Sequence, residues 1–363
     1  MKKILFLSNT ANFSKFNIPY MRWFKEQGWQ VDYCSAGEEL VPDCDNQYSI
    51  NIARSPFSLK NVKAYFELKK ILKENEYDIL HCHTPMGGFL GRLAACSLHK
   101  KHKIKVIYTA HGFHFYKGAP LFNWLAYYPV ERILAHKTDV LITINSEDYE
   151  RAKTFKAGKI FYVPGVGVDI NKFRIFNKDK VSDLRLEFGI PNEAKVLLSV
   201  GEVNKNKNHK IVIEALPDMP DFWYIICGKG PLVERYKKLA EGLGVADRLI
   251  MAGYRENIAD FCNMADIFVF PSLREGLGLA LIEAMAAGLP CIAVKNRGTK
   301  DSLGEDSQLF FDANSVKDLS EKIKKVLNGS VDEIQRNNLR LQKYNITNTL
   351  QIMQQIYMNE MSD

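Results

Sequence analysis

Residues 274–290 read REGLGLALIEAMAAGLP, and this stretch decides the fold class. The apolar run over residues 266–271 that precedes it is typical of a buried strand. Gly276 and Gly278 then predict a turn, and the apolar residues after them predict a short helix. The helix should end at Gly288, because glycine is common just past a helix C-terminus and a proline follows closely. A strand, a glycine turn and a helix in this order indicate a parallel α/β sheet.

The same alternation of short apolar runs and helical patterns continues on both sides of this stretch. It is interrupted at residues 162–169, YVPGVGVD, where we expect an interdomain hinge that runs on to about residue 190. We therefore predict two Rossmann-like, doubly wound parallel sheets that face a cleft, in domains 1–168 and 169–345, with a C-terminal helix at 346–363 that packs back onto the first domain. The remaining strands are expected at residues 4–8, 30–34, 78–83, 105–110, 140–145, 196–201, 223–228, 248–252 and 291–294.

Charge and composition restrict the partners and the compartment. Residues 1–168 contain 23 Lys and Arg against 15 Asp and Glu, so the first half holds all of the excess positive charge of the 363-residue chain. No nucleic-acid motif accompanies this charge, and an anionic membrane surface or a phosphate-bearing acceptor fits it at least as well. The apolar run at the start is too short for a signal peptide, and the seven cysteines form no C-x-x-C pair. We expect a reduced, cytoplasmic protein.

The glycine turn at 276–278 has the chemistry of a diphosphate site. Backbone N–H groups at a helix N-terminus are free to bind an anion, and the helix dipole favours negative charge there. The turn also lies at the carboxyl edge of a parallel sheet, where such sheets bind ligands. Glu275 and Glu283 lie on either side, and carboxylates suit the hydroxyl groups of a sugar or a ribose. Glu283 taken alone would be interpreted as a solvated helix residue.

Several motifs together resemble the family 4 retaining glycosyltransferases, which have the GT-B fold. Seven residues separate Glu275 from Glu283, as in the E-x7-E motif of that family. The resemblance covers essentially the whole chain, because four further segments agree in order and spacing. These are HCHTP at 81–85, AHGFH at 110–114, PGVGVD at 164–169 and GKGP at 228–231.

The resemblance implies a role for each matching residue. Glu275 would hold hydroxyls of the donor sugar, Glu283 the ribose, and Lys207 the donor diphosphate, while His111 would lie near the reacting carbon. The leaving phosphate would accept the proton on the same face, so that configuration is retained without a protein nucleophile, a metal or a cofactor. The donor would be a nucleotide sugar, UDP-linked by family habit and an N-acetylhexosamine as one possibility. The remaining donor-binding positions are Gly228, Gly230, Gly276, Gly278, Leu279 and Ala280.

Two departures from the family pattern concern binding residues. Glu202 stands where the family usually has an arginine, so that either Lys205 supplies the second cation or Glu202 has another use. The same G-E-x-N-K-N-K-N-H form is found in family members that act in bacterial capsule and exopolysaccharide assembly. The first turn lacks the usual glycine pair and carries Asn9 and Asn12, which with His83 are candidates for the acceptor side.

Metal-binding patterns are weak. Asp43-Cys44-Asp45 has the form D-x-D but lies in a loop after Pro42 rather than at the end of an apolar strand. His81, Cys82 and His83 alternate along a strand and cannot all face one ion. The sequence therefore predicts no metal site.

Two other functions remain open: a nucleotide-sugar epimerase of the same architecture, and a non-catalytic nucleotide-sugar-binding subunit that Glu202 would suit. A dehydrogenase is disfavoured because no G-x-G-x-x-G follows the first strand. A lysine-rich helix expected at 60–75, with an apolar stripe of Val62, Tyr65, Phe66, Leu68, Ile71 and Leu72, is typical of membrane-surface binding. The aromatic run 113–128 is expected to divide between core and an apolar rim. We thus expect a peripheral enzyme on the inner membrane face that extends a polyprenyl-diphosphate-linked glycan.

Overall fold

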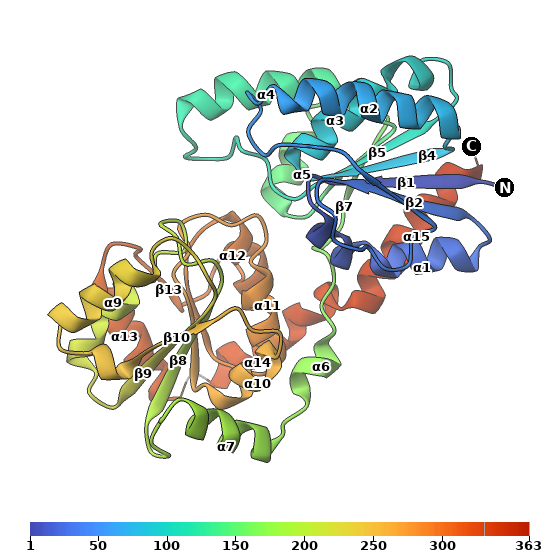
Figure 1. The fold of residues 1–363 in the computed structure, drawn as a ribbon. Coiled ribbons are helices and arrows are strands. Elements are labelled where there is room, and N and C mark those ends of the chain that lie inside the picture. Colours follow the sequence, from blue (N-terminus) through green and yellow to red (C-terminus); the bar gives the residue numbers. More distant parts are fainter. Residues whose placement is uncertain (330, 363) are drawn as a thin grey trace. The chain divides into compact units, whose positions relative to one another are not determined.

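A computed structural model describes residues 1–329 and 331–362, and the chain divides into two compact units (Figure 1). Unit 1 consists of Met1–Val166 together with the C-terminal segment from Thr349. Unit 2 consists of Gly167–Asn348. Each unit contains its own parallel sheet with helices on both faces.

The sheet of unit 1 has the strand order β3-β2-β1-β4-β5-β6-β7 within the described residues, with every pair parallel. Chain order reverses at β1, which lies between β2 and β4, and this is the topological position at which doubly wound sheets bind ligands. The central strands are apolar and buried because helices cover both faces. The strands are β1 Lys3–Leu7, β2 Gln30–Ser35, β3 Asn46–Ser49, β4 Ile79–His83, β5 Lys105–Ala110, β6 Val140–Thr143 and β7 Lys159–Tyr162.

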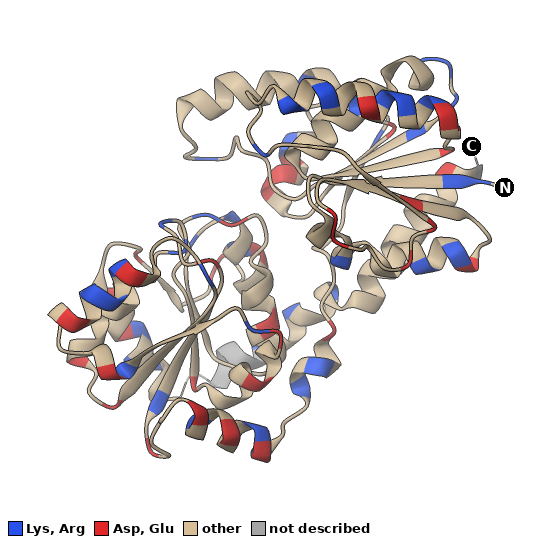
Figure 2. Cartoon of the chain, in the orientation of Figure 1, with Lys and Arg blue, Asp and Glu red and all other residues tan. Residues whose placement is uncertain are grey.

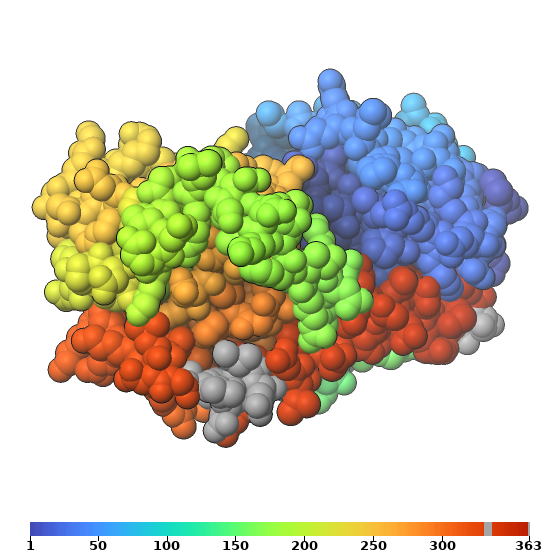
Figure 3. Space-filling view, turned by 90° about the horizontal axis from the view of Figure 1, so that it is seen from below, coloured from blue at the N-terminus to red at the C-terminus, as the bar shows by residue number. Residues whose placement is uncertain are grey.

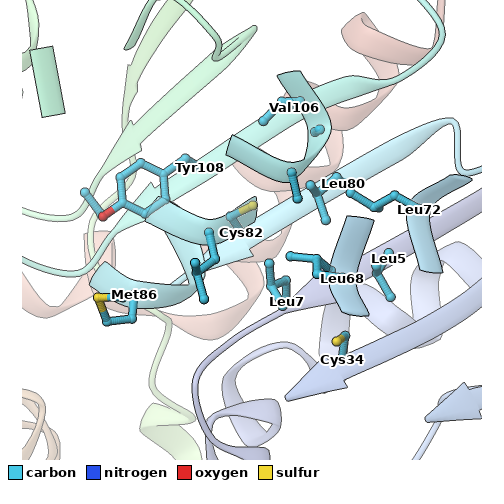
Figure 4. Close-up of a cluster of buried hydrophobic side chains, with 14 of the residues drawn as sticks. Leu5, Leu7, Cys34, Leu68, Leu72, Leu80, Cys82, Met86, Val106 and Tyr108 are labelled. Atoms are coloured by element: carbon cyan, nitrogen blue, oxygen red, sulfur yellow. The ribbon is translucent and has the colours of Figure 1, made fainter. Parts of the chain in front are cut away.

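Two buried clusters join the helices of unit 1 to its sheet. One cluster packs α2 and α3 onto the sheet through residues such as Leu7, Leu68 and Leu80 (Figure 4). Figure 4 also shows Met86 and Tyr108 at one end of this cluster. The other cluster covers the opposite face. The helices are η1 Ala11–Phe16, α1 Ile18–Glu26, α2 Lys60–Asn75, α3 Pro85–His99, α4 Leu121–Ala135, α5 Ser146–Ala152 and α15 Ile346–Ser362.

The C-terminal helix α15 completes the second cluster of unit 1. Met353, Ile356 and Tyr357 are buried there, and the Tyr357 ring lies 4.8 Å from that of Phe24 on α1. Figure 3 shows the red C-terminal segment against the blue N-terminal segments of this unit. Residues from the two ends of the chain therefore share one core.

Unit 2 contains a parallel sheet with the order β10-β9-β8-β11-β12-β13 in the part of the chain that the structure describes. Its chain order reverses at β8, so the carboxyl ends of β8 and β11 are neighbours. The strands are β8 Lys195–Val200, β9 Phe222–Cys227, β10 Leu249–Gly253, β11 Ile267–Phe270, β12 Cys291–Val294 and β13 Phe310–Phe311. The helices are α6 Ile170–Arg174, α7 Lys178–Glu187, α8 Lys210–Ala215, η2 Leu216–Asp218, α9 Val233–Gly242, η3 Ala246–Arg248, α10 Ile258–Met264, α11 Leu279–Ala286, α12 Arg297–Leu303, α13 Val316–Leu327, α14 Val331–Leu341 and η4 Gln342–Tyr344.

Three expectations from the sequence are corrected. The strands β3, β7 and β13 were not predicted, because they lie at sheet edges; β3 and β7 are half-exposed and β13 is only two residues long. The hinge was expected to run on from residues 162–169 to about residue 190, but most of this extension forms α6 and α7 of unit 2.

The third correction concerns α2, whose apolar residues do not all share one packed stripe. Leu68 and Leu72 are buried, whereas Val62 and Phe66 are exposed. No helix among the described residues is long and apolar enough to cross a bilayer.

Candidate active site

Two loops at the carboxyl edge of the unit 2 sheet bring Lys207 and Glu275 together. Lys207 follows β8 and Glu275 follows β11, and these strands are neighbours. Lys207 Nζ donates a hydrogen bond to Glu275 Oε1 over 2.7 Å, and the two side chains are 19% and 16% exposed. The ammonium also lies 5.0 Å from the centroid of the Phe270 ring. An ammonium has three donors, so one hydrogen bond to Glu275 leaves others for a ligand.

The loop that carries Glu275 is fixed through its backbone carbonyls. Asn206 Nδ2 donates to the carbonyl of Arg274 over 2.9 Å, and Arg297 Nε donates to that of Glu275 over 3.3 Å. Ser302 Oγ donates to the carbonyl of Leu277 over 3.4 Å. The glutamate is therefore held in place before any ligand binds.

Sequence reasoning missed Arg297 and Ser302. The signal that could have located their helix is the capping box at the start of α12, where Asn296 and Thr299 cap each other's backbone. This cap fixes the position of α12, from which both side chains extend to the loop.

The helix α11 begins directly after this loop, and its first turn is uncapped. Gly278 is the N-cap residue, with a φ of 84° and no side chain to cap the helix. The N–H groups of Leu279 and Ala280 in the first turn have no partner within the helix. They are thus donors for an anion, and the positive end of the helix dipole adds to them. Gly276 is half-buried in the loop, and Glu283 lies half-buried one turn along α11.

The glycines of the GKGP segment allow close packing between backbones. A Cβ atom on Gly228 would lie 1.8 Å from the carbonyl oxygen of Gly201, and one on Gly230 would lie 2.4 Å from that of Val203. The loop after β9 therefore supports the loop after β8, which carries Lys207.

The loop after β8 also contains Glu202, Lys205 and His209. Glu202 and Lys205 are exposed, and neither forms an ion pair with another described residue. His209 is buried, and its Nδ1 lies 3.0 Å from the hydroxyl of Tyr224. Burial lowers the pKa of His209 to about 3, with a smaller effect from Lys207.

Three histidines meet at the carboxyl edge of the unit 1 sheet. His83 Nδ1 lies 3.2 Å from His111 Nε2, and His81 Nε2 lies 2.8 Å from Thr109 Oγ1. The hydroxyl of Tyr357 on α15 lies 2.7 Å from His81 Nδ1. Burial lowers the pKa of His81 to about 3 and that of His111 to about 4, so both rings are neutral at pH 7.

The expected acceptor-side residues occupy different positions around this cluster. His83 is only 2% exposed and contacts His111, so its burial leaves little of it available to a ligand. The N–H of Asn9 donates to Thr84 Oγ1 over 3.1 Å, and Asn9 lines a pocket of about 360 Å³. Asn12 is exposed and is not part of that lining. Phe13, which sequence reasoning did not select, packs edge-on against His111 with ring centroids 4.7 Å apart.

The two aspartates of the D-x-D pattern form surface ion pairs. Asp43 pairs with Arg22 at 3.0 Å, and Asp45 pairs with Lys25 at 2.8 Å. Over residues 1–329 and 331–362, no group of three or more His, Cys, Asp and Glu side chains is arranged to hold a metal ion.

Family models match a segment in each of the two units. The family model described as "Glycosyl transferases group 1" matches residues 181–346, and the model "Glycosyl transferase 4-like" matches residues 3–145. EpsD of Bacillus subtilis (strain 168), which carries the name of a glycosyltransferase, is 42% identical over 317 residues, which cover 85% of this chain and 83% of that protein. The chain is a group 1 glycosyltransferase.

Other relatives of this group 1 glycosyltransferase are more distant. The UDP-Gal:alpha-D-GlcNAc-diphosphoundecaprenol alpha-1,3-galactosyltransferase of Escherichia coli is 29% identical, over 92% of this chain and 87% of that protein. Anabaena Alr3699/HepE, solved with UDP and glucose, superimposes with a TM-score of 0.80 at 17% identity, covering 99% of this chain and 100% of that chain. Sucrose-phosphate synthase from Thermosynechococcus elongatus superimposes with a TM-score of 0.79 at 19% identity, covering 100% of both chains. The predicted GT-B fold and the predicted retaining, family 4 class of enzyme are confirmed.

Proposed function

We propose that this glycosyltransferase moves a sugar from a UDP-linked donor, an N-acetylhexosamine as one possibility, to a polyprenyl-diphosphate-linked glycan during surface polysaccharide synthesis. The pair of Lys207 and Glu275 beside the uncapped start of α11 is the observation that carries the donor half of this proposal. A cation, two free backbone donors and a carboxylate there match the two parts of a sugar diphosphate.

Each residue of this site has a distinct task in the proposal. Lys207 and the N–H groups of Leu279 and Ala280 bind the diphosphate, while Glu275 accepts hydrogen bonds from sugar hydroxyls. Glu283, one turn further along α11, binds the ribose hydroxyls. Lys205 is exposed and carries the positive charge that the family's arginine would otherwise supply.

The reaction exchanges one bond at the anomeric carbon for another. The bond to the diphosphate oxygen breaks as the acceptor hydroxyl attacks from the same face, and the leaving phosphate takes the hydroxyl proton. Lys207 and the α11 N-terminus stabilise the negative charge that develops on the diphosphate. His111 is neutral at pH 7, so it can approach the sugar without an unfavourable positive charge beside a cationic transition state.

The acceptor half of the proposal depends on the basic face of unit 1. The five lysines of α2 are all exposed, and Figure 2 shows their charge along this helix. Two of them form i,i+4 pairs with Glu67 and Glu74, so the helix keeps a net positive charge. This face would hold the enzyme at the anionic inner leaflet, where polyprenyl-linked acceptors are located. The lysines are Lys60, Lys63, Lys69, Lys70 and Lys73.

The proposal is tested with labelled UDP-sugars and GlcNAc-diphosphoundecaprenol as a first acceptor. Transfer of label to the lipid, with the anomeric configuration retained by NMR, supports it. Conversion of the donor to its epimer would instead indicate an epimerase, and saturable binding without either product would indicate a binding subunit. If no label is transferred, a panel of other acceptors is tested. An active enzyme given the wrong acceptor should still hydrolyse the donor slowly, whereas an inactive enzyme should not.

A further inference from the structure

Unit 1 contains an apolar cavity of about 220 Å³ between α3 and α4, apart from the histidine cluster. Its lining includes Met86, Phe89, Phe115, Ala126 and Val130. An apolar cavity of roughly 150 Å³ is already large enough to bind benzene and stays free of water. This cavity is therefore suited to a hydrocarbon ligand.

The mouth of the cavity is formed by apolar side chains that face solvent. Phe57 and Phe122 belong to the lining and are 80% and 59% exposed. Leu59, Leu121 and Leu125 beside them in sequence are also exposed. Figure 2 shows few charged residues on the N-terminal part of α4, in contrast to α2. Large exposed apolar residues gathered at one opening are typical of a surface that contacts lipid or another apolar partner.

A second pocket of about 360 Å³ adjoins this cavity, and its lining adds polar side chains such as Asn9 and Thr84 to apolar ones. The two share part of their lining, including Met86, His114 and Tyr127. The second pocket is also lined by Arg54, and among the described residues no carboxylate forms an ion pair with this arginine. Phe13 lines the same pocket and contacts His111. The apolar cavity and the pocket that contains Arg54 thus share a wall, and Phe13 connects that pocket to His111.

We propose that the cavity holds the first isoprene units of the acceptor's lipid chain and that Arg54 binds the acceptor's diphosphate. The apolar cavity, Arg54 and the side of the pocket at His111 provide adjacent sites for the three parts of a polyprenyl-diphosphate-linked sugar: the lipid chain, the diphosphate, and the sugar with the hydroxyl that reacts. The net positive charge of residues 1–168 complements the diphosphate. This inference rests on the proposed function, since it specifies the acceptor of the same reaction.

Binding of farnesyl diphosphate and methyl diphosphate tests the site without knowledge of the glycan. Wild-type protein should bind farnesyl diphosphate at least about tenfold more tightly, because only its chain enters the cavity. Ala126→Trp, which fills the cavity, should abolish this difference. The control is Ile133→Trp, an exposed position on the same helix that is not part of the lining and should change nothing. Phe122→Ala, at the exposed rim, should reduce the difference and keeps the test valid if Ala126→Trp does not fold.

Arg54→Gln should lower the affinity for farnesyl diphosphate and for methyl diphosphate by about tenfold, and should leave the binding of farnesol unchanged. The control Lys101→Gln, at an exposed position that lines neither pocket, should have no effect. Equal affinity of wild type for farnesyl and methyl diphosphate, or full affinity in folded Ala126→Trp, would overturn the inference. Binding of UDP-sugars is measured on the same samples. If the protein binds UDP-sugars but shows no preference for farnesyl diphosphate over methyl diphosphate, this inference alone is refuted. If it shows neither UDP-sugar binding nor that preference, the proposed function is refuted.

Discussion

Lys207 and Glu275 are 68 positions apart in the chain, yet their side chains form a 2.7 Å ion pair beside the first turn of α11. Each side chain orients the other. In the proposed reaction both must also contact the donor, the lysine through its remaining N–H groups and the glutamate through its second oxygen. The pair therefore couples the diphosphate and sugar parts of the site.

Replacement of either partner should reduce turnover strongly. We expect Glu275→Ala and Lys207→Ala each to lower kcat/KM by about a hundredfold or more, because each removes a preorganised group that acts in the transition state. Steady-state kinetics with the UDP-sugar donor measure this, and circular dichroism checks that the variants fold. Lys237→Ala, an exposed residue on α9, is the matched control. Near-normal activity in both site variants would refute the assignment of the donor site.

Activity should survive removal of divalent metal ions. The donor diphosphate is expected to be neutralised by Lys207 and helix N–H groups, so no metal is required in the proposed mechanism. Turnover is compared before and after dialysis against EDTA. Complete loss that manganese or magnesium restores would contradict the prediction and would direct attention back to Asp43 and Asp45.

Folding stability should fall as the pH is lowered from about 7 toward 4. The pKa values of His81 and His209 are lowered from 6.5 to about 3 by burial, so the unfolded chain binds more protons below pH 6.5. The two neutral histidines contribute fully to folding stability above pH 6.5, and this contribution decreases as the pH falls. Each of these two histidines should lower the free energy of unfolding by about 1.4 kcal/mol at pH 5.5 relative to pH 7.5. Urea titrations at the two pH values measure the loss, and an unchanged free energy of unfolding would contradict the assignment of neutral, buried histidines.

Binding to anionic vesicles should depend on the lysines of α2. At about 1 kcal/mol per lysine near an anionic surface, several together give reversible attachment that salt weakens. Wild type should sediment with anionic liposomes at low salt, and a Lys63/Lys69/Lys70/Lys73→Gln variant should not.

The control for vesicle binding changes the same number of lysines on α13 of unit 2, Lys317/Lys322/Lys324/Lys325→Gln, and should still sediment. Failure of wild type to bind anionic vesicles would remove the membrane part of the proposal. The assignment as a glycosyltransferase would be unaffected.

Gly228→Ala should destabilise the protein rather than only weaken donor binding. The new Cβ would lie 1.8 Å from the carbonyl oxygen of Gly201, and backbone atoms on both sides must move to relieve this contact. We expect a loss of about 2 kcal/mol or more in the free energy of unfolding. Gly242→Ala, where a Cβ meets nothing within 4 Å, is the control. Unchanged stability with reduced affinity for UDP would show that Gly228 acts on the ligand directly.

The fold class and the donor motif could be predicted from local sequence patterns alone. Short apolar runs that alternate with helical patterns favour a parallel sheet with helices on both faces, and local sequence places Glu275 in the turn between β11 and α11. The edge strands β3, β7 and β13 escaped prediction because an edge strand is paired on one side only and needs no apolar run.

Contacts between residues far apart in the chain could not be predicted and became visible in the folded structure. Arg297 meets the loop of Glu275, Tyr357 meets His81, and Phe13 meets His111, each across a large separation in sequence. These contacts depend on which strands are neighbours and on where helices cross them, and local periodicity does not encode either. The exposure of Val62 and Phe66 was decided in the same way, because a helical stripe is buried only as far as its partner covers it.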